Sequence, residues 1–83
     1  MIETRIVMLK GHLWTPLGNG PVHVWCRTQA AYAFSDDEPK MEPGVGFPLP
    51  IERAVTLDFG PIWVSLVSES SEADLVIAAE IGP

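Results

Sequence analysis

Proline and glycine divide this chain so often that no long helix has room to form. Eight prolines and seven glycines are spread over 83 residues. Each proline removes a backbone hydrogen-bond donor and disfavours a helical conformation at the residue before it. The uninterrupted segments are therefore short, and this favours strands joined by loops.

Alternating apolar side chains predict half-buried strands at residues 22–27 and 54–59. The side chains expected to point inward are Val22, Val24 and Cys26 in the first strand and Val55, Leu57 and Phe59 in the second. Two further strands are predicted at residues 4–9 and 30–34. We expect the strand at 30–34 to pair back onto 22–27 through the short connection between them.

The last third of the sequence contains two more apolar runs, at residues 62–68 and 73–80. The polar segment 69–72 separates them, which predicts a β-hairpin. A helix over 73–80 is disfavoured because Val76 and Ile77 are β-branched and the run is short.

Loops are expected at residues 10–20 and 35–50, where glycine, proline and charged residues gather. About six short strands without a long helix predict an all-β fold, either a small β-sandwich or a jelly-roll-like barrel of short antiparallel strands. We expect a single β domain over residues 1–83. Residues 1–20 are expected to form an N-terminal docking strand and loop.

The net charge of −6 comes from five Lys and Arg residues against eleven Asp and Glu residues. It argues against nucleic-acid binding, which depends on basic side chains that neutralise phosphates. Cys26 is the only cysteine, so no intrachain disulfide can form, as expected for a chain made in a reducing cytoplasm. The apolar run at residues 6–9 is far shorter than the hydrophobic region of a signal peptide. We therefore expect neither a nucleic acid nor a membrane as a partner.

The residues that could carry chemistry are few and poorly spaced for a catalytic or metal site. His23 and Cys26 are three apart in a predicted strand, so their side chains point to opposite faces and cannot converge on one zinc ion. The acidic segment 36–38 with Glu42 lacks the ligand order of a calcium loop and is interrupted by Pro39. We expect no enzymatic activity, no metal and no cofactor.

The three tryptophans carry more information. Trp25 and Trp63 occupy the nominally outward faces of two predicted strands, and Trp14 lies in the loop at 10–20. Either other segments of the chain cover these side chains, or they contact another subunit, since tryptophan is enriched in interface hot spots. The residues predicted for an interface are Leu13, Trp14, Leu17, Trp25, Trp63 and Val67. The first three are expected to matter for docking more than for folding, because apolar side chains on a loop have little reason within the chain to be buried.

From residue 20 onward the order of features is specific. A strand follows Gly20-Pro21, a turn is expected at residues 43–44, Trp63 lies between hydrophobic residues after a second Gly-Pro step, and an apolar strand closes the pattern at 73–80. This order resembles small β proteins of tailed bacteriophages that are encoded among virion genes. Some of these are capsid cement, or decoration, proteins. The resemblance implies a jelly-roll-like or sandwich subunit that forms trimers on the outside of a head shell.

Self-association is expected on physical grounds as well. A domain of this size buries only about 60–65% of its unfolded surface, and neither a disulfide nor a metal reinforces it. The runs at 62–68 and 73–80 are apolar on both faces, so something must cover the second face. We expect a homotrimer, with Trp63 and Val67 near the shared interface and the acidic loop at 36–42 outside it.

Three hypotheses of function remain open. The first is a structural virion protein, a decoration subunit that binds a major capsid protein on the capsid exterior; tail and head-junction components belong to the same class. The second is a small-ligand or carbohydrate-binding module in which Trp14 or Trp25 stacks on a sugar or peptide. The third is an acidic inhibitor of a host protein, which the net charge of −6 permits.

Overall fold

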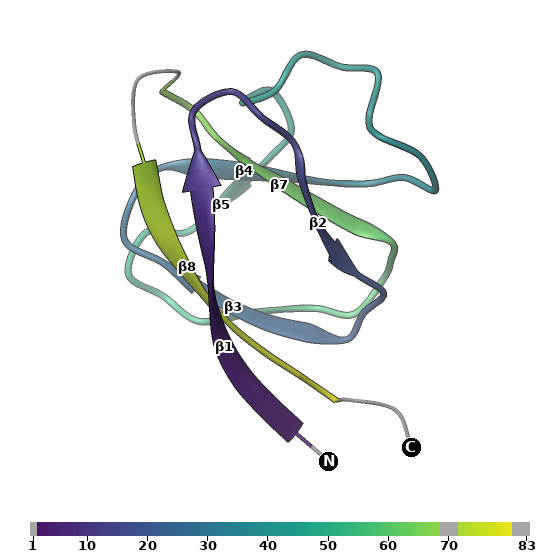
Figure 1. Ribbon diagram of the computed structural model, residues 1–83, viewed down its shortest axis with the longest axis vertical. Helices are drawn as coiled ribbons and strands as arrows, with labels where there is room; N and C mark the ends of the chain where they lie inside the picture. The colour runs from purple at the N-terminus through teal and green to yellow at the C-terminus, as the bar shows by residue number, and fades with distance from the viewer. Residues whose placement is uncertain (1, 69–71, 81–83) are drawn as a thin grey trace.

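Eight strands make up the regular structure of this computed structural model, which describes residues 2–68 and 72–80 apart from the side chain of Glu80 (Figure 1). The strands are β1 (Ile2–Lys10), β2 (Thr15–Gly18), β3 (Val22–Cys26), β4 (Ala30–Phe34), β5 (Phe47–Leu49), β6 (Val55–Leu57), β7 (Ile62–Leu66) and β8 (Glu72–Glu80). Within these residues there is no helix that could cross a membrane. The predicted all-β class is confirmed.

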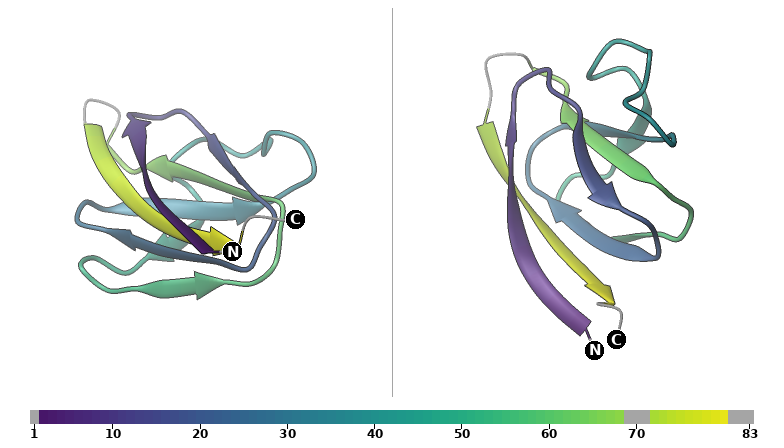
Figure 2. Two further views of the ribbon diagram at one scale, coloured as in Figure 1. Left: turned by 60° about the horizontal axis from the view of Figure 1, so that its bottom comes forward. Right: turned by 45° about the vertical axis from the view of Figure 1, so that its right-hand side comes forward.

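The strands form two four-stranded antiparallel sheets that face each other (Figure 2). The strand orders are β1-β8-β3-β6 and β2-β7-β4-β5. Within each sheet, strands from the first half of the chain (β1–β4) alternate with strands from the second half (β5–β8). This is the eight-stranded arrangement of a jelly roll. Of the two architectures left open by the sequence, the strand order therefore selects the jelly-roll type of sandwich.

Two predicted strand pairings are wrong. The strand at 30–34 does not pair with 22–27, and the runs at 62–68 and 73–80 do not form a hairpin, because each pair is split between the two sheets. Among the described strands, only β4 and β5 pair with a neighbour in sequence. A short polar connection marks a change of chain direction, but it does not determine whether the chain returns to the same sheet or crosses to the other. The predicted turn at 69–71 lies outside the described residues.

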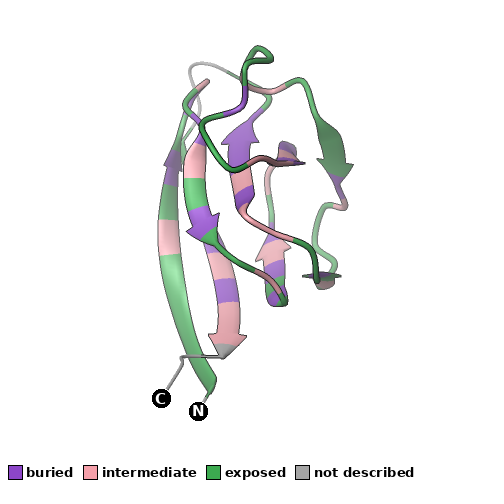
Figure 3. Ribbon diagram, turned by 90° about the vertical axis from the view of Figure 1, so that its right-hand side faces the viewer, coloured by how far each residue is buried: buried purple, intermediate pink, exposed green. Residues whose placement is uncertain are grey.

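The main core lies between the sheets, and its side chains come from alternate positions of the strands (Figure 3). Its buried members are Leu9, Leu17, Val22, Val24, Cys26, Ala30, Leu49, Leu57, Ile62, Val64, Leu66, Leu75 and Ile77. The alternation predicted in residues 22–27 is therefore confirmed. Phe59 was expected to point inward but is 67% exposed, because β6 ends at Leu57 and the alternation ends with it.

The expected loop at 10–20 contains a strand. Residues 15–18 form β2, which pairs with β7 despite the proline at its second position. Proline is tolerated in edge strands, and β2 is the edge of its sheet. The alternation along β2 directs Leu17 into the core, so the expectation that Leu17 has little reason within the chain to be buried is wrong.

The β2–β3 and β6–β7 connections pack closely against each other. A Cβ atom placed on Gly60 would lie 2.6 Å from the backbone nitrogen of Gly20 and 2.8 Å from the Cα of Asn19. A Cβ atom on Gly20 would lie 2.6 Å from the carbonyl oxygen of Leu57. Both positions require glycine, because the atoms in the way belong to backbone in a closely packed structure.

Candidate interaction surface

The outer face of the β2-β7-β4-β5 sheet is covered by the chain itself. The segment 35–46, which connects β4 to β5, lies over this face and is held there by three hydrogen bonds. The indole Nε1–H of Trp63 donates to the carbonyl oxygen of Ser35 at 2.9 Å, and that of Trp14 donates to the carbonyl oxygen of Met41 at 3.0 Å. The backbone N–H of Gly44 donates to Ser65 Oγ at 2.6 Å.

A second, smaller group of buried side chains lies beneath this segment. Ala31, Ala33 and Ser65 point away from the main core, yet each is at most 2% exposed, and Pro39 of the covering segment is also buried. Trp14 is 8% exposed. For Trp14 and Trp63, the structure thus selects the first of the two interpretations left open by the sequence, in which the chain covers its own tryptophans. The expectation that Trp14 has little reason to be buried within the chain is wrong.

Replacing Ser65 by alanine tests the attachment of this segment. The Gly44 N–H would lose its acceptor, and we expect a loss of about 1 kcal/mol in the free energy of unfolding together with faster amide exchange around residues 41–45. Hydrogen–deuterium exchange of the wild type and the variant measures this directly. A Lys40→Ala variant, altered at an exposed position of the same segment, is the control. Unchanged exchange at Gly44 in Ser65→Ala would contradict the contact.

The outer face of the β1-β8-β3-β6 sheet has no such cover among the described residues. Ile6 of β1 lies opposite Val76 of β8, and Val76 lies opposite Trp25 of β3. The three side chains therefore form an apolar row across three strands on the face that points away from the core. Ile6 is 65% exposed, and Val76 and Trp25 are half-buried.

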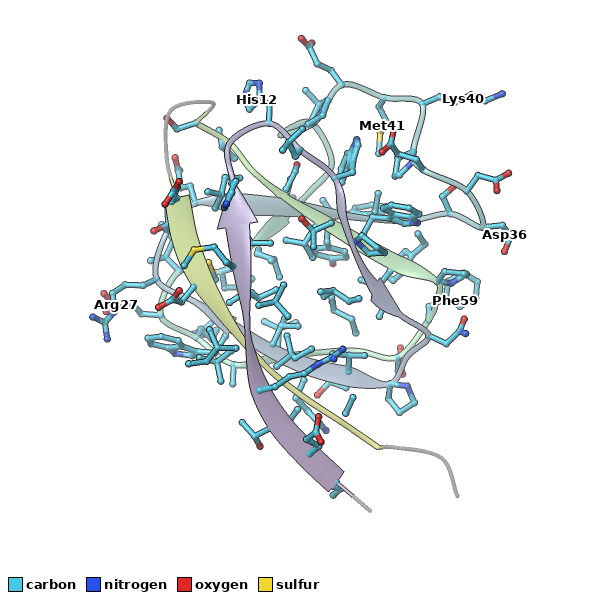
Figure 4. All side chains as sticks on the ribbon, viewed as in Figure 1. His12, Arg27, Asp36, Lys40, Met41 and Phe59 are labelled. Atoms are coloured by element: carbon cyan, nitrogen blue, oxygen red, sulfur yellow. The ribbon has the colours of Figure 1, made fainter. Side chains whose placement is uncertain are left out.

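Charged groups border this row at one end. The Arg27 guanidinium lies over the Trp25 ring, 5.3 Å from its centroid, a cation–π geometry. An open depression of about 310 Å³ lies beside the pair. Its lining residues are Ile6, Trp25, Arg27, Thr28, Ala73, Asp74 and Val76. Figure 4 shows Arg27 on the opposite side of the view from Asp36, Lys40 and Met41 of the covering segment.

The six predicted interface residues do not come together on one surface. Trp25 belongs to the apolar row, whereas Leu17 lies in the main core and Trp14 and Trp63 lie under the 35–46 segment. Leu13 and Val67 are exposed, at 63% and 43%. Leu13 lies in the β1–β2 connection and Val67 directly follows β7. A hydrogen bond of 2.6 Å between His12 Nε2 and the Val67 carbonyl oxygen links these two segments.

Sequence reasoning did not name Ile6 or Val76 as interface residues, although it noted that residues 73–80 are apolar on both faces. A usable signal existed in residues 6–9, because four consecutive apolar residues in a strand place apolar side chains on both faces. Val7 and Leu9 pack inward, which leaves Ile6 and Met8 outside.

A second exposed apolar group lies beside β5. Phe34 packs edge to face on Phe59, with ring centroids 5.4 Å apart, and Tyr32 lies 5.4 Å from Phe47. Phe47 and Phe59 are both more than half exposed. The four rings contact one another, so they already form a cluster within the chain.

The polar residues singled out in the sequence make local contacts. His23 Nδ1 lies 2.7 Å from Thr56 Oγ1 on the neighbouring strand, and the buried Cys26 thiol donates to the carbonyl oxygen of Thr28 at 3.2 Å. In residues 2–68 and 72–80, no three His, Cys, Asp or Glu side chains gather in a group that could hold a metal ion.

Comparisons with protein-family models, curated proteins and solved structures find no match for this chain.

Proposed function

We propose that this chain is a structural virion protein, a decoration subunit that binds the head shell of a tailed phage through the outer face of the β1-β8-β3-β6 sheet. The observation that carries the proposal is the difference between the two outer faces. One is covered by the 35–46 segment, and the other presents the uncovered row of Ile6, Val76 and Trp25. An exposed apolar group of this kind is typical of a surface that contacts another protein.

The fold and the apolar row both support this proposal. Eight-stranded jelly rolls recur in viral capsid domains and also in lectins, so the fold by itself does not fix a function. Complete burial of an exposed large apolar side chain contributes roughly 1.5–3 kcal/mol. Ile6 is 65% exposed, whereas Val76 and Trp25 are already half-buried and would each contribute only part of that range. An assembly that links two or more copies of this surface would bind a repeated array of sites with added avidity.

One of the arguments for the predicted homotrimer no longer holds. The prediction placed Trp63 near the shared interface because the outer face of residues 62–68 needed a cover. The 35–46 segment provides that cover within the chain. The proposed docking surface therefore does not include Trp63.

Ligand binding at Trp25 is the second candidate. The observation in its favour is the depression beside Trp25, in which Arg27, Thr28 and Asp74 offer polar groups next to an aromatic ring. A sugar or peptide bound there would protect Trp25 fluorescence from quenching by iodide. Trp14 is no longer a candidate for this role because it is buried under Met41.

The test is binding to heads purified from the phage that encodes the chain. Replacing Val76 by lysine introduces a charge into the middle of the apolar row, and we expect at least about a tenfold loss of affinity in co-sedimentation. The matched control is Val45→Lys, which changes an exposed valine on the covering segment. Thermal melting shows whether both variants stay folded.

Two results would overturn the proposal. One is the absence of wild-type protein from sedimented heads at saturating concentration. The other is equal binding by the Val76→Lys and Val45→Lys variants, which would exclude the apolar row as the docking surface.

A further inference from the structure

Three of the four sheet edges carry features that discourage the addition of another strand. β2 contains Pro16, and its pairing with β7 shifts register between Pro16 and Gly18. β5 contains Pro48 and has three residues, and β6 is also only three residues long. Proline, irregular register and short length are the usual means by which edge strands avoid pairing with other chains.

The remaining edge, β1, has none of these three features, and its charged side chains, which can also oppose pairing, are of both signs. It is nine residues long, contains no proline and pairs with β8 in unbroken register from Ile2 to Lys10. No described strand pairs with its other side. Figure 3 shows this strand, next to the N label, as exposed over most of its length. Its outer edge therefore offers unpaired backbone groups to another extended chain.

The sequence of β1 specifies which strand fits there. Glu3 and Arg5 are exposed, lie on the same face and flank Thr4. If a second copy of β1 runs antiparallel with Thr4 opposite Thr4, then Glu3 of each copy lies opposite Arg5 of the other. On the other face Ile2 lies opposite Ile6. The strand is complementary to itself in both charge and hydrophobicity.

Other two-fold registers lack this match. Centring the pair on Glu3 or on Arg5 places like charges opposite each other, which is destabilising. Centring it on Ile6 places Glu3 opposite Leu9 and Arg5 opposite Val7. Within β1, the Thr4-centred register is the one that pairs opposite charges.

We infer that two copies of this chain associate through β1 in an antiparallel, two-fold arrangement centred on Thr4, which joins their β1-β8-β3-β6 sheets into one eight-stranded sheet. Such a contact uses the same surface on both copies and closes after two subunits. It does not depend on a role on a head shell. The arrangement also places the two apolar rows on the same face of the joined sheet, because the register preserves the faces.

Charge exchange tests this pairing without disturbing the pairing inside the chain. The β8 neighbours of Glu3 and Arg5 are Ala79 and Ile77, so neither charge has a directly opposed charged neighbour in its own sheet. Glu3→Arg places arginine opposite arginine across the two-fold axis, and Arg5→Glu places glutamate opposite glutamate. We expect each variant to weaken dimerisation at least about tenfold.

Two combinations should restore the dimer. The double variant Glu3→Arg/Arg5→Glu regains opposite charges in both positions. An equimolar mixture of the two single variants should form a heterodimer, because the arginines of one meet the glutamates of the other. Lys40→Glu is the control, since residue 40 is an exposed position on the 35–46 segment, which lies over the other sheet. At a concentration low enough for every sample to be monomeric, thermal melting should be unchanged in all variants.

Light scattering coupled to gel filtration over a concentration series measures the mass of each sample. The expected result is twice the 9.1 kDa chain mass for the wild type, the double variant and the mixture, and the chain mass itself for each single variant. A wild type that remains monomeric or forms a trimer would overturn the inference. So would failure of the double variant and the mixture to recover the mass.

Discussion

Replacing Trp14 by alanine is expected to lower the free energy of unfolding by about 3–5 kcal/mol, the range for removing a buried tryptophan. Trp14 is 8% exposed and its indole donates to the Met41 carbonyl oxygen. The variant therefore loses apolar contacts and leaves an acceptor without its donor. The expected effect is on the stability of the isolated chain, which is the opposite of what a docking residue on an exposed loop would show.

Denaturant unfolding followed by circular dichroism measures this loss. The neighbouring Leu13→Ala variant is the control, because Leu13 is 63% exposed and its removal should change stability by less than about 0.5 kcal/mol. Trp14→Phe separates the two contributions, since it keeps most of the ring but not the hydrogen bond. If the Trp14→Ala variant is as stable as Leu13→Ala, then Trp14 is not part of the packed structure, and the hypothesis that it contacts another subunit would be favoured again.

Replacing Gly60 by alanine is expected to cost about 3 kcal/mol, because the added methyl group meets the backbone of the β2–β3 connection. A Cβ atom there would lie 2.6 Å from the Gly20 nitrogen, and neither backbone segment can move without disturbing the strand that follows it. The same argument applies to Gly20 against Leu57.

Gly18→Ala provides the comparison. Gly18 has a φ of +91°, and no atom lies within 4 Å of a Cβ built on it. Alanine there has only the conformational cost of a positive φ, about 1 kcal/mol. Thermal or denaturant unfolding of both variants measures the difference. If Gly60→Ala is no less stable than Gly18→Ala, then the two connections do not pack as described.

The strands themselves could be predicted from local pattern, but their assignment to sheets could not. Val22, Val24 and Cys26 alternate in a way that fixes which face of β3 is buried. Nothing in that alternation says which strand lies beside β3. In the structure its neighbours are β8 and β6, which come much later in the chain. Both wrong pairings arose from the assumption that strands adjacent in sequence are adjacent in a sheet.

For the tryptophans as well, local sequence pattern predicts the strand but not what lies beside it in space. Trp25 and Trp63 have the same local pattern, an aromatic residue on the outward face of a short strand. Their surroundings differ because the 35–46 segment lies over one sheet and not over the other. That segment is long, charged and rich in proline, and its course depends on contacts with Trp14 and Ser65 that lie far away in sequence. A residue's own neighbours in sequence cannot reveal such a cover.

The position of β1 has a consequence for how the chain is made. β1 is synthesised before every other strand, but β8 is the strand it pairs with in its sheet, and β8 is synthesised after all the others. Until β8 leaves the ribosome, β1 has no strand beside it in the sheet, and β3 lacks one of its two neighbours. Non-local strand pairing of this kind is slow and leaves apolar surface open to other molecules meanwhile. Translation that stops before residue 72 would therefore release a chain in which β1 lacks β8, the strand with which it pairs.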